Sequence, residues 1–343
     1  MRKVGLSIDE LFVKHINSFD HPESPDRVYI INDMLNETGI INNLTILKTR
    51  DATKQEICAV HTEKYFNRIA STKGKAKVFL DQDTSTNPFS YDAAVRASGG
   101  VLQAIDEIMD KEIDTAFCIE RPPGHHAEAD RAMGFCLFNH AAVGVGHLLN
   151  KGLKKVLIID WDVHHGNGTQ HIFEASNNVL FFSTHQFPFY PGTGAITEHG
   201  MDEGKGYTVN VPLSAGMGDK EYIKIFHEIL VPAAKQFSPE FIIVSAGFDS
   251  YVNDPLGGMN VSADGFSRLT EIVINLSEHL CDGRLLLLLE GGYNLTGLAE
   301  CTNKVFETLI NYESADETNI SDTTAADKII DEVKNNYSGF WTF

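Results

Sequence analysis

The sequence predicts an α/β protein in which a parallel sheet carries helices on both faces. Short, continuous runs of apolar and β-branched residues alternate with longer segments of helical periodicity, which is typical of strand–helix–strand units. The 343 residues suffice for a single large domain, and no internal repeat divides them. We expect buried strands at residues 115–119, 156–160, 179–183, 241–245 and 285–289.

Helices are expected between these strands. Ser24 followed by Pro25 predicts the N-cap and first residue of an early helix that runs through Leu35. For the last of the later helices, Ser262 or Asp264 is the expected cap. The later helices are predicted at residues 91–109, 220–236 and 264–280.

The end of the chain differs in composition from the rest. Residues 312–324 are polar and acidic and resemble a linker, and residues 325–335 have the pattern of a short amphipathic helix. Phe340, Trp341 and Phe343 follow, and they could dock on the main body or on another subunit. We therefore expect one domain over residues 1–311 and a linker with an aromatic tail over 312–343.

The charge balance and the cysteines narrow the function classes. The net charge of −19 repels phosphate backbones and disfavours direct nucleic-acid binding. It suits cationic ligands, such as lysine-rich peptides or polyamines, or it only keeps the protein soluble. The five cysteines are scattered and form no CxxC pair, which favours reduced thiols over a disulfide framework. No signal peptide and no apolar run long enough for a membrane span are present, so we expect a cytoplasmic protein.

Five polar loops directly follow predicted strands. FCIE leads into RPPGHH, VLIID into WDVHHGNG, FFS into THQFPFYPGTG, FIIVS into AGFDS, and LLLLLE into GGYN. The carboxyl ends of parallel strands meet at one edge of a sheet, and ligands bind there. Any one loop could be an ordinary turn, but the five together predict an active site at this edge.

Asp162, His164 and Asp249 are the candidate metal ligands. Residues i and i+2 of an extended segment point the same way, so Asp162 and His164 can hold one ion together, and Asp249 at the end of another strand can join them. Two carboxylates and one imidazole leave an open fourth position, as a catalytic zinc site requires. Fe²⁺ or Co²⁺ could occupy the same ligands. A DxH pair alone is more often a surface pair, but a buried strand precedes this one and glycines follow it.

His125, His126 and Tyr293 are the candidate catalytic side chains. Adjacent histidines are costly in a core, because each must find hydrogen-bond partners. They predict either a satisfied structural pair or a general base beside a second imidazole that steadies charge. The Tyr293 hydroxyl could donate to a developing oxyanion, although a lone tyrosine is more often a packing residue.

These motifs resemble those of the histone deacetylase family. RPPGHH, GFCLFNHAAV, DWDVHHGNGTQHIF, FYPGTG, SAGFDSYVNDPLGG and EGGYN occur in the family's order and are most similar to the class II enzymes and their bacterial relatives. HPESPDR resembles the family's opening motif, so the resemblance runs from about His21 to about Ala299. It implies the arginase-deacetylase fold, with about eight parallel strands, and zinc-dependent hydrolysis of acetyl-amides, above all acetyl-lysine in proteins.

The resemblance also implies a role for each catalytic residue. His126 is the general base and acid, with His125 as its electrostatic partner, and Tyr293 polarises the carbonyl that a metal-activated water attacks. Asn167 stands where class I members have an aspartate, so it cannot raise the pKa of His126 as a carboxylate would. Asp160 can pair with His125, which favours a neutral His126.

Further positions match family residues that contact substrate or ions. Those at the substrate tunnel, its rim and its inner end are Gly134, Phe135, Tyr190, Leu256, Gly292 and Arg27. Asp81 and Asp83 lie in a loop that matches a family segment whose aspartate holds the substrate backbone, so cationic substrates are expected to be favoured. Tyr190 stands where many members have phenylalanine, and the match at the two aspartates is loose. The resemblance implies a potassium site on the side chains of Asp160, Asp162 and Ser183 and the carbonyls of His164 and Thr184. A second monovalent site would involve Phe173, Ser176, Val179 and Tyr207.

Three alternatives remain beside a lysine deacetylase. An acetylpolyamine amidohydrolase shares the fold and metal, so acetylated polyamines are alternative substrates. A ureohydrolase typically needs DxHxD and two metals, but Gly166 leaves the second-metal carboxylate missing. A binder of acetyl-lysine without activity is disfavoured by the intact ligands, both histidines and Tyr293. The sequence does not settle the acyl preference or whether the chain forms a homo-oligomer.

Overall fold

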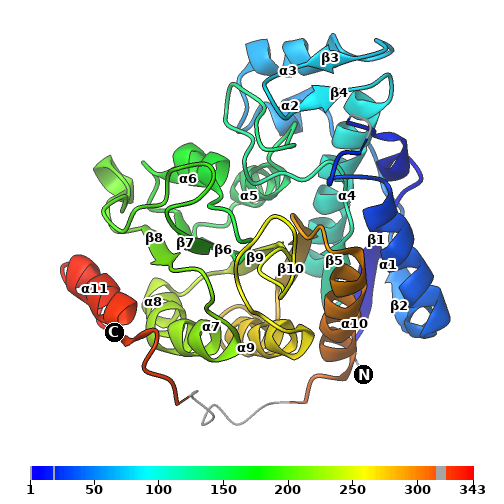
Figure 1. Ribbon diagram of the computed structural model, residues 1–343. Helices are drawn as coiled ribbons and strands as arrows, with labels where there is room; N and C mark the ends of the chain where they lie inside the picture. The colour runs from blue at the N-terminus through cyan, green and yellow to red at the C-terminus, as the bar shows by residue number, and fades with distance from the viewer. Residues whose placement is uncertain (1, 18–19, 314–321) are drawn as a thin grey trace.

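The computed structural model describes residues 2–17, 20–313 and 322–343, and its centre is one eight-stranded sheet (Figure 1). The strand order is β2–β1–β5–β10–β9–β6–β7–β8, and every neighbouring pair is parallel. The parallel α/β sheet predicted from the sequence is therefore confirmed. A separate two-stranded antiparallel ribbon pairs β3 (Val78–Phe79) with β4 (Ser85–Thr86).

All five predicted strands form, with small differences in length. They are β5 (Thr115–Cys118), β6 (Val156–Asp160), β7 (Val179–Gln186), β9 (Phe241–Ala246) and β10 (Leu285–Leu289). Three further strands were not predicted individually: β1 (Val4–Ser7), β2 (Leu44–Ile46) and β8 (Thr208–Leu213). β2 has three residues, and β8 mixes polar residues and a proline into its run, so these two patterns do not stand out in the sequence.

Two hydrophobic cores cover the two faces of the sheet. Leu285, Leu287 and Leu289 of β10 belong to one core, whereas Leu286 and Leu288 belong to the other. Side chains of a strand alternate between faces, so a continuous apolar run is explained by burial on both sides.

Helices of the first core are α1 (Asp26–Glu37), α7 (Asp219–Ile225), α8 (Val231–Phe237), α9 (Ala263–Leu280) and α10 (Leu295–Asn311). Helices of the second core are α4 (Ser90–Met109), α5 (His140–Asn150) and α6 (Asn167–Phe173). Two smaller helices, α2 (Lys54–Ile57) and α3 (Glu63–Ala70), pack outside α4 and α5. Short 3₁₀ turns occupy Phe12–Lys14, Ile40–Asn43 and Asp202–Gly204. No helix in the described ranges is long and apolar enough to cross a bilayer.

Two helix predictions need correction. Helix α1 begins at Asp26 with Pro25 in the cap position, and Ser24 makes no side-chain cap, because its carbonyl rather than its hydroxyl accepts the Arg27 N–H (3.2 Å). The helix predicted at 220–236 is interrupted by a π-helical turn at Phe226–Leu230. Pro232, near the start of α8, lacks the N–H that an α-helical turn would use there. The Ser262 cap of α9 is confirmed by its bond from the Gly265 N–H.

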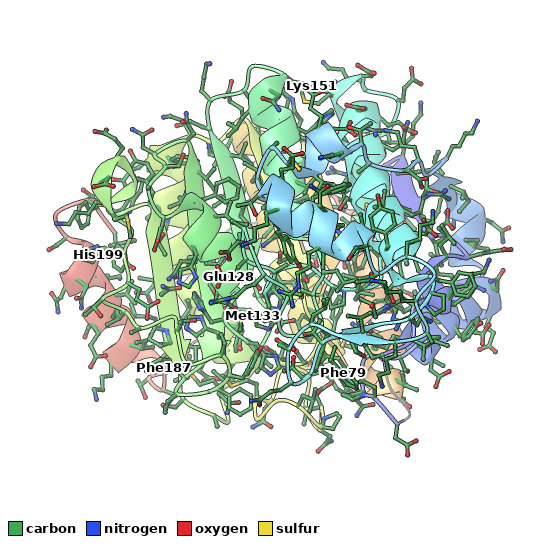
Figure 2. All side chains as sticks on the ribbon, turned by 90° about the horizontal axis from the view of Figure 1, so that it is seen from above. Phe79, Glu128, Met133, Lys151, Phe187 and His199 are labelled. Atoms are coloured by element: carbon green, nitrogen blue, oxygen red, sulfur yellow. The ribbon has the colours of Figure 1, made fainter. Side chains whose placement is uncertain are left out.

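The C-terminal segment lies along the open edge of the sheet. Residues 314–321 of the expected linker lie outside the described residues, and α11 spans Asp327–Tyr337, two residues later than predicted. The Tyr337 hydroxyl accepts the N–H of Asn210 on the edge strand β8 (3.2 Å), and the Trp341 indole N–H donates to the Gly206 carbonyl (2.7 Å). Figure 2 shows His199 beside this helix, in ring contact with Tyr337. The aromatic tail thus packs against the body of its own chain.

Candidate active site

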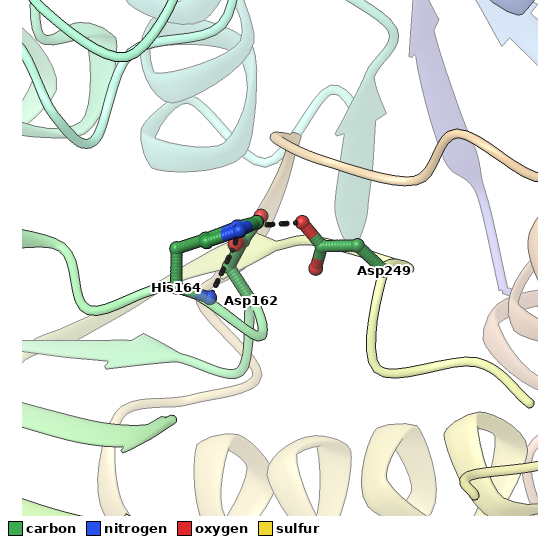
Figure 3. Close-up of side chains that lie close together, drawn as sticks. All are labelled: Asp162, His164 and Asp249. Carbon is green, nitrogen blue, oxygen red and sulfur yellow. Dashed lines mark hydrogen bonds and ion pairs between the residues drawn. The ribbon is translucent and has the colours of Figure 1, made fainter. Parts of the chain in front are cut away.

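Asp162, His164 and Asp249 come together at the carboxyl edge of the sheet (Figure 3). Nδ1 of His164 lies 3.2 Å from Oδ1 of Asp162 and 3.1 Å from Oδ2 of Asp249. All three residues are buried, and their ligand atoms lie within 4.8 Å of one another. The adjacent strands β6 and β9 end side by side, which brings residues of two loops into one cluster.

The surroundings of this cluster fit a divalent cation. Backbone N–H groups hold both carboxylates: those of Gly291 (2.7 Å) and His164 (2.9 Å) donate to the two oxygens of Asp162, and that of Val163 (2.8 Å) donates to Oδ1 of Asp249. Oδ1 of Asp162 and Oδ2 of Asp249 face the His164 ring. A Cβ atom at Gly291 would lie 2.1 Å from an oxygen of Asp249, so only glycine allows this approach. Burial, together with the charge of Asp162, raises the pKa of Asp249 to about 7. Two buried carboxylates and one imidazole form the donor set of a catalytic zinc site, and a bound cation would compensate the crowded negative charge.

The two adjacent histidines have different hydrogen-bond partners. His125 Nδ1 lies 3.0 Å from Oδ2 of Asp160, whereas His126 Nδ1 lies 2.7 Å from Oδ1 of Asn167. Burial opposes a charged His125, but Asp162 and Asp160 outweigh it and raise the pKa of His125 well above its ordinary value. Burial, and then the charge of His125, lower the pKa of His126 far below its ordinary value. These opposite shifts favour a charged His125 beside a neutral His126.

Glu290 fixes the histidine loop, and the sequence analysis missed it. One of its carboxylate oxygens accepts the N–H groups of Gly124 (2.7 Å) and His125 (3.0 Å), and the other accepts the Ser245 hydroxyl (3.1 Å). Burial raises the pKa of Glu290 to about 7. The available signal was its position, since a carboxylate directly after five leucines must end a buried strand.

Tyr293 is placed by its backbone and its ring. Its N–H donates to Oδ2 of Asp254 (2.7 Å), and Oδ1 of the same carboxylate accepts the Leu256 N–H (2.9 Å). The Arg27 guanidinium lies 5.1 Å from the ring centroid and donates to the carbonyls of Gly292 and Glu290. Burial raises the pKa of Tyr293 well above its ordinary value, so the phenol is a proton donor. Asp254 is a second positioning carboxylate that the sequence analysis missed.

A cavity of about 430 Å³ opens onto this cluster. Gly134 and Phe135 have positive φ angles (55° and 69°), and the Phe135 ring meets Tyr293 edge to face at 6.1 Å. Phe189, which was not predicted, stacks on the His164 ring at 5.4 Å. The predicted residues that line the cavity are Asp83, His126, Gly134, Phe135, His164, Tyr190, Leu256 and Tyr293. The lining residues that were not predicted are Gln186, Phe189, Pro255, Gly257 and Gly258.

Three predicted substrate contacts lie outside this lining. Arg27 and Gly292 do not line the cavity. The Arg27 guanidinium donates to the Gly292 carbonyl (2.8 Å) and so holds the loop that carries Tyr293. Asp81 accepts the N–H groups of Asp83 (3.0 Å) and Thr84 (2.7 Å), so it shapes the turn that presents Asp83. The Thr84 hydroxyl in turn accepts the Phe135 N–H (3.0 Å), which ties this turn to the cavity wall.

The expected potassium ligands lie next to the metal cluster. Asp160 and Ser183 are register partners on β6 and β7, and Asp160 also accepts the Asp162 N–H (3.1 Å). Thr184, whose carbonyl is the expected ligand, follows Ser183 on β7 and is buried.

The second expected ion site stays a prediction, and the structure gives the backbone partners of its residues. The carbonyls of Phe173 and Tyr207 accept backbone N–H groups from Ser176 (2.8 Å) and Phe181 (2.9 Å), while Val179 begins β7. Among the described residues, the Asp162–His164–Asp249 group is the one cluster with the geometry of a metal site built from side chains.

These features define an α/β protein with a candidate metal-dependent hydrolytic site at the carboxyl edge of its sheet. The model of the histone deacetylase domain matches residues 21–309. A probable deacetylase from Archaeoglobus fulgidus is 40% identical over 87% of this chain and 84% of its own length. Histone deacetylase 15 from Arabidopsis thaliana is 40% identical over 98% of this chain, which corresponds to 62% of that longer protein. The crystal structure of the HDA15 HD domain matches with a TM-score of 0.92 and 39% identity, over 99% of this chain and 95% of that one.

The chain therefore belongs to the histone deacetylase family of hydrolases, and it has the arginase-deacetylase fold.

Proposed function

We propose that this protein removes acetyl groups from amines and that acetyl-lysine side chains of proteins are its main substrates. The observation that carries the proposal is the cavity that His126, His164 and Tyr293 line together, next to two buried aspartates. A general base, a metal ligand and a hydroxyl donor around one point are the parts that amide hydrolysis needs. The relatives named above as deacetylases support the same reaction class.

The residues that would hold zinc are Asp162, His164 and Asp249. In such a site zinc supplies Lewis-acid polarisation of a carbonyl and a lowered pKa of water. His164 must bind in its neutral form, although the two aspartates raise its pKa to about 10. Loading the site should therefore release a proton from His164.

Proton transfer is assigned to the histidine pair. Neutral His126 accepts a proton from the attacking water and later gives it to the leaving amine. His125 is held by Asp160 and keeps its charge, which stabilises negative charge that develops nearby. The Tyr293 phenol donates a hydrogen bond to the carbonyl oxygen as it becomes an oxyanion.

The cavity wall suits a slender aliphatic chain. Phe135, Phe189 and Tyr190 provide aromatic surface, and Leu256 adds apolar surface at the rim. Asp83 is the single carboxylate among the residues that line the cavity. It could receive the backbone N–H of a peptide or the ammonium group of a polyamine, so acetylated polyamines remain the competing substrates.

Kinetics on the zinc-loaded protein test the proposal. We expect acetate release from a fluorogenic acetyl-lysine peptide, with a higher kcat/KM than for acetylated polyamines measured in parallel. The His126→Ala variant should lose this activity and keep its metal. Absence of acetate release from every substrate by protein with full zinc content would contradict the proposal, and a preference for the polyamines would move it to the alternative.

A further inference from the structure

We propose that Glu128 is a positioning residue that sets the tautomer of His126 by orienting the amide of Asn167. The inference rests on the proposed function, in which His126 is the general base. Glu128 lies two residues beyond His126, and its carboxylate is buried. Figure 2 shows Glu128 and Met133 close together near the middle of the molecule.

The hydrogen bonds around Asn167 define its orientation. Nδ2 of Asn167 donates to Oε1 of Glu128 (2.7 Å), and Oδ1 of Asn167 lies 2.7 Å from Nδ1 of His126. An ionised carboxylate can only accept hydrogen bonds, so the group that faces Glu128 must be the NH₂ of the amide. The carbonyl oxygen of Asn167 is then directed to His126.

This orientation decides which ring nitrogen of His126 carries the proton. An amide oxygen can only accept, so Nδ1 of His126 must be the N–H donor in its bond to Asn167. The other nitrogen, Nε2, keeps its lone pair. His126 lines the cavity, so this arrangement prepares it to accept a proton there.

Without Glu128 the amide would lack its strongest acceptor. The other acceptors near Nδ2 of Asn167 are the Met133 sulfur (3.2 Å) and the His126 carbonyl (3.4 Å), and sulfur accepts only weakly. A rotated amide would present NH₂ to Nδ1 of His126, which would then accept, and the proton would move to Nε2. In that tautomer Nε2 of His126 carries the proton, and the remaining lone pair, on Nδ1, is used by the bond from Asn167, so Nε2 cannot act as the base.

The surrounding structure holds Glu128 in place and keeps it ionised. Oε1 of Glu128 also receives bonds from His171 Nδ1 (2.8 Å) and Arg131 Nη2 (3.3 Å). The helix that carries Asn167 approaches the histidine loop closely, since a Cβ atom at Gly168 would lie 2.3 Å from the Ala127 carbonyl. The Glu128 carboxylate therefore has three partners, Asn167, His171 and Arg131. Through them the network runs from His126 to the protein surface, where the Arg131 side chain is exposed.

The test combines the tautomer of His126 with kinetics. Long-range ¹H–¹⁵N spectra of zinc-loaded protein labelled on histidine should show His126 protonated at Nδ1 in the wild type. In Glu128→Ala we expect a shift toward the Nε2–H tautomer and a fall in kcat on the order of tenfold, with little change in KM. Glu128→Gln should restore both, because its carbonyl oxygen can accept from Asn167. Glu300→Ala, which removes an exposed carboxylate that accepts the Tyr251 hydroxyl (2.8 Å) and has no part in this network, should leave tautomer and kcat unchanged.

Two results would overturn the inference. One is a Glu128→Ala protein that keeps the Nδ1–H tautomer and the wild-type kcat. The other is an Nε2–H tautomer in the wild type, which can be measured whether or not the alanine variant folds. The tautomer is read without substrate, so a shift in Glu128→Ala supports the role of Glu128 even if no acetyl-amide is hydrolysed, whereas that lack of hydrolysis would count against the proposed function.

Discussion

Replacing Tyr293 by phenylalanine separates a hydrolase from a protein that only binds acetyl groups. The change removes one hydroxyl and leaves the ring, whose place is set by the Tyr293 N–H bond to Asp254 (2.7 Å) and by contacts with Phe135 and Arg27. Fold and zinc content should therefore persist. The lost hydroxyl is the proposed oxyanion donor, and removal of one such donor typically lowers turnover about a hundredfold to a thousandfold, or about 3 to 4 kcal/mol.

Kinetics and metal analysis together check this expectation. Steady-state rates on an acetyl-lysine peptide should show a large fall in kcat with a small change in KM, because the bond strengthens in the transition state. Tyr251→Phe is a matched control, since its hydroxyl bonds Glu300 (2.8 Å) and does not line the cavity. Wild-type turnover by a zinc-loaded Tyr293→Phe protein would refute the oxyanion role.

The other predictions concern the metal, the pH dependence of stability and the tail. Asp249→Asn should lose most of its zinc by elemental analysis, because a carboxylate ligand becomes a neutral amide, and full zinc occupancy would exclude Asp249 as a ligand. Burial lowers the pKa of His61 from 6.5 to about 4, so between these values the unfolded chain binds more protons and the free energy of unfolding should fall by about 3 kcal/mol as the pH drops from 6.5 to 4. Denaturant titrations at several pH values should show that the free energy of unfolding of His61→Gln depends less on pH than that of the wild type. The same pH dependence in both proteins would refute this account. Trp341→Ala should expose the tail to proteolysis, because it removes the bond to Gly206 and a buried ring, whereas the exposed Asn335→Ala should not.

The candidate site was largely predictable because its main residues follow strands with a strong signal. Continuous apolar runs such as residues 285–289 predict buried parallel strands. In such a sheet the carboxyl ends lie at one edge, so the loops with His126, Asp162 and Tyr293 had to meet. The two-residue spacing of Asp162 and His164 further indicated a shared ligand.

The residues that hold the site in place could not be predicted, because their partners are distant in sequence. Glu290 binds N–H groups that lie up to 166 residues away, and Asp254 and Glu128 each bind a group 39 residues away. A single carboxylate has no periodicity that reveals its acceptor role, so its partner is decided by how the loops pack.

The apolar runs of this protein determined its layered α/β architecture, since such strands must be buried on both faces, and the polar segments that follow these runs determined the kinds of side chain at its carboxyl edge. The tertiary structure alone decided which side chain Nδ1 of His126 contacts, which carboxylates bind the N–H groups of the loops at the site, and that the C-terminal helix covers the N–H of Asn210 on the edge strand of its own chain. These features depend on the directions of hydrogen bonds between distant segments, and those directions exist only after the segments have packed together.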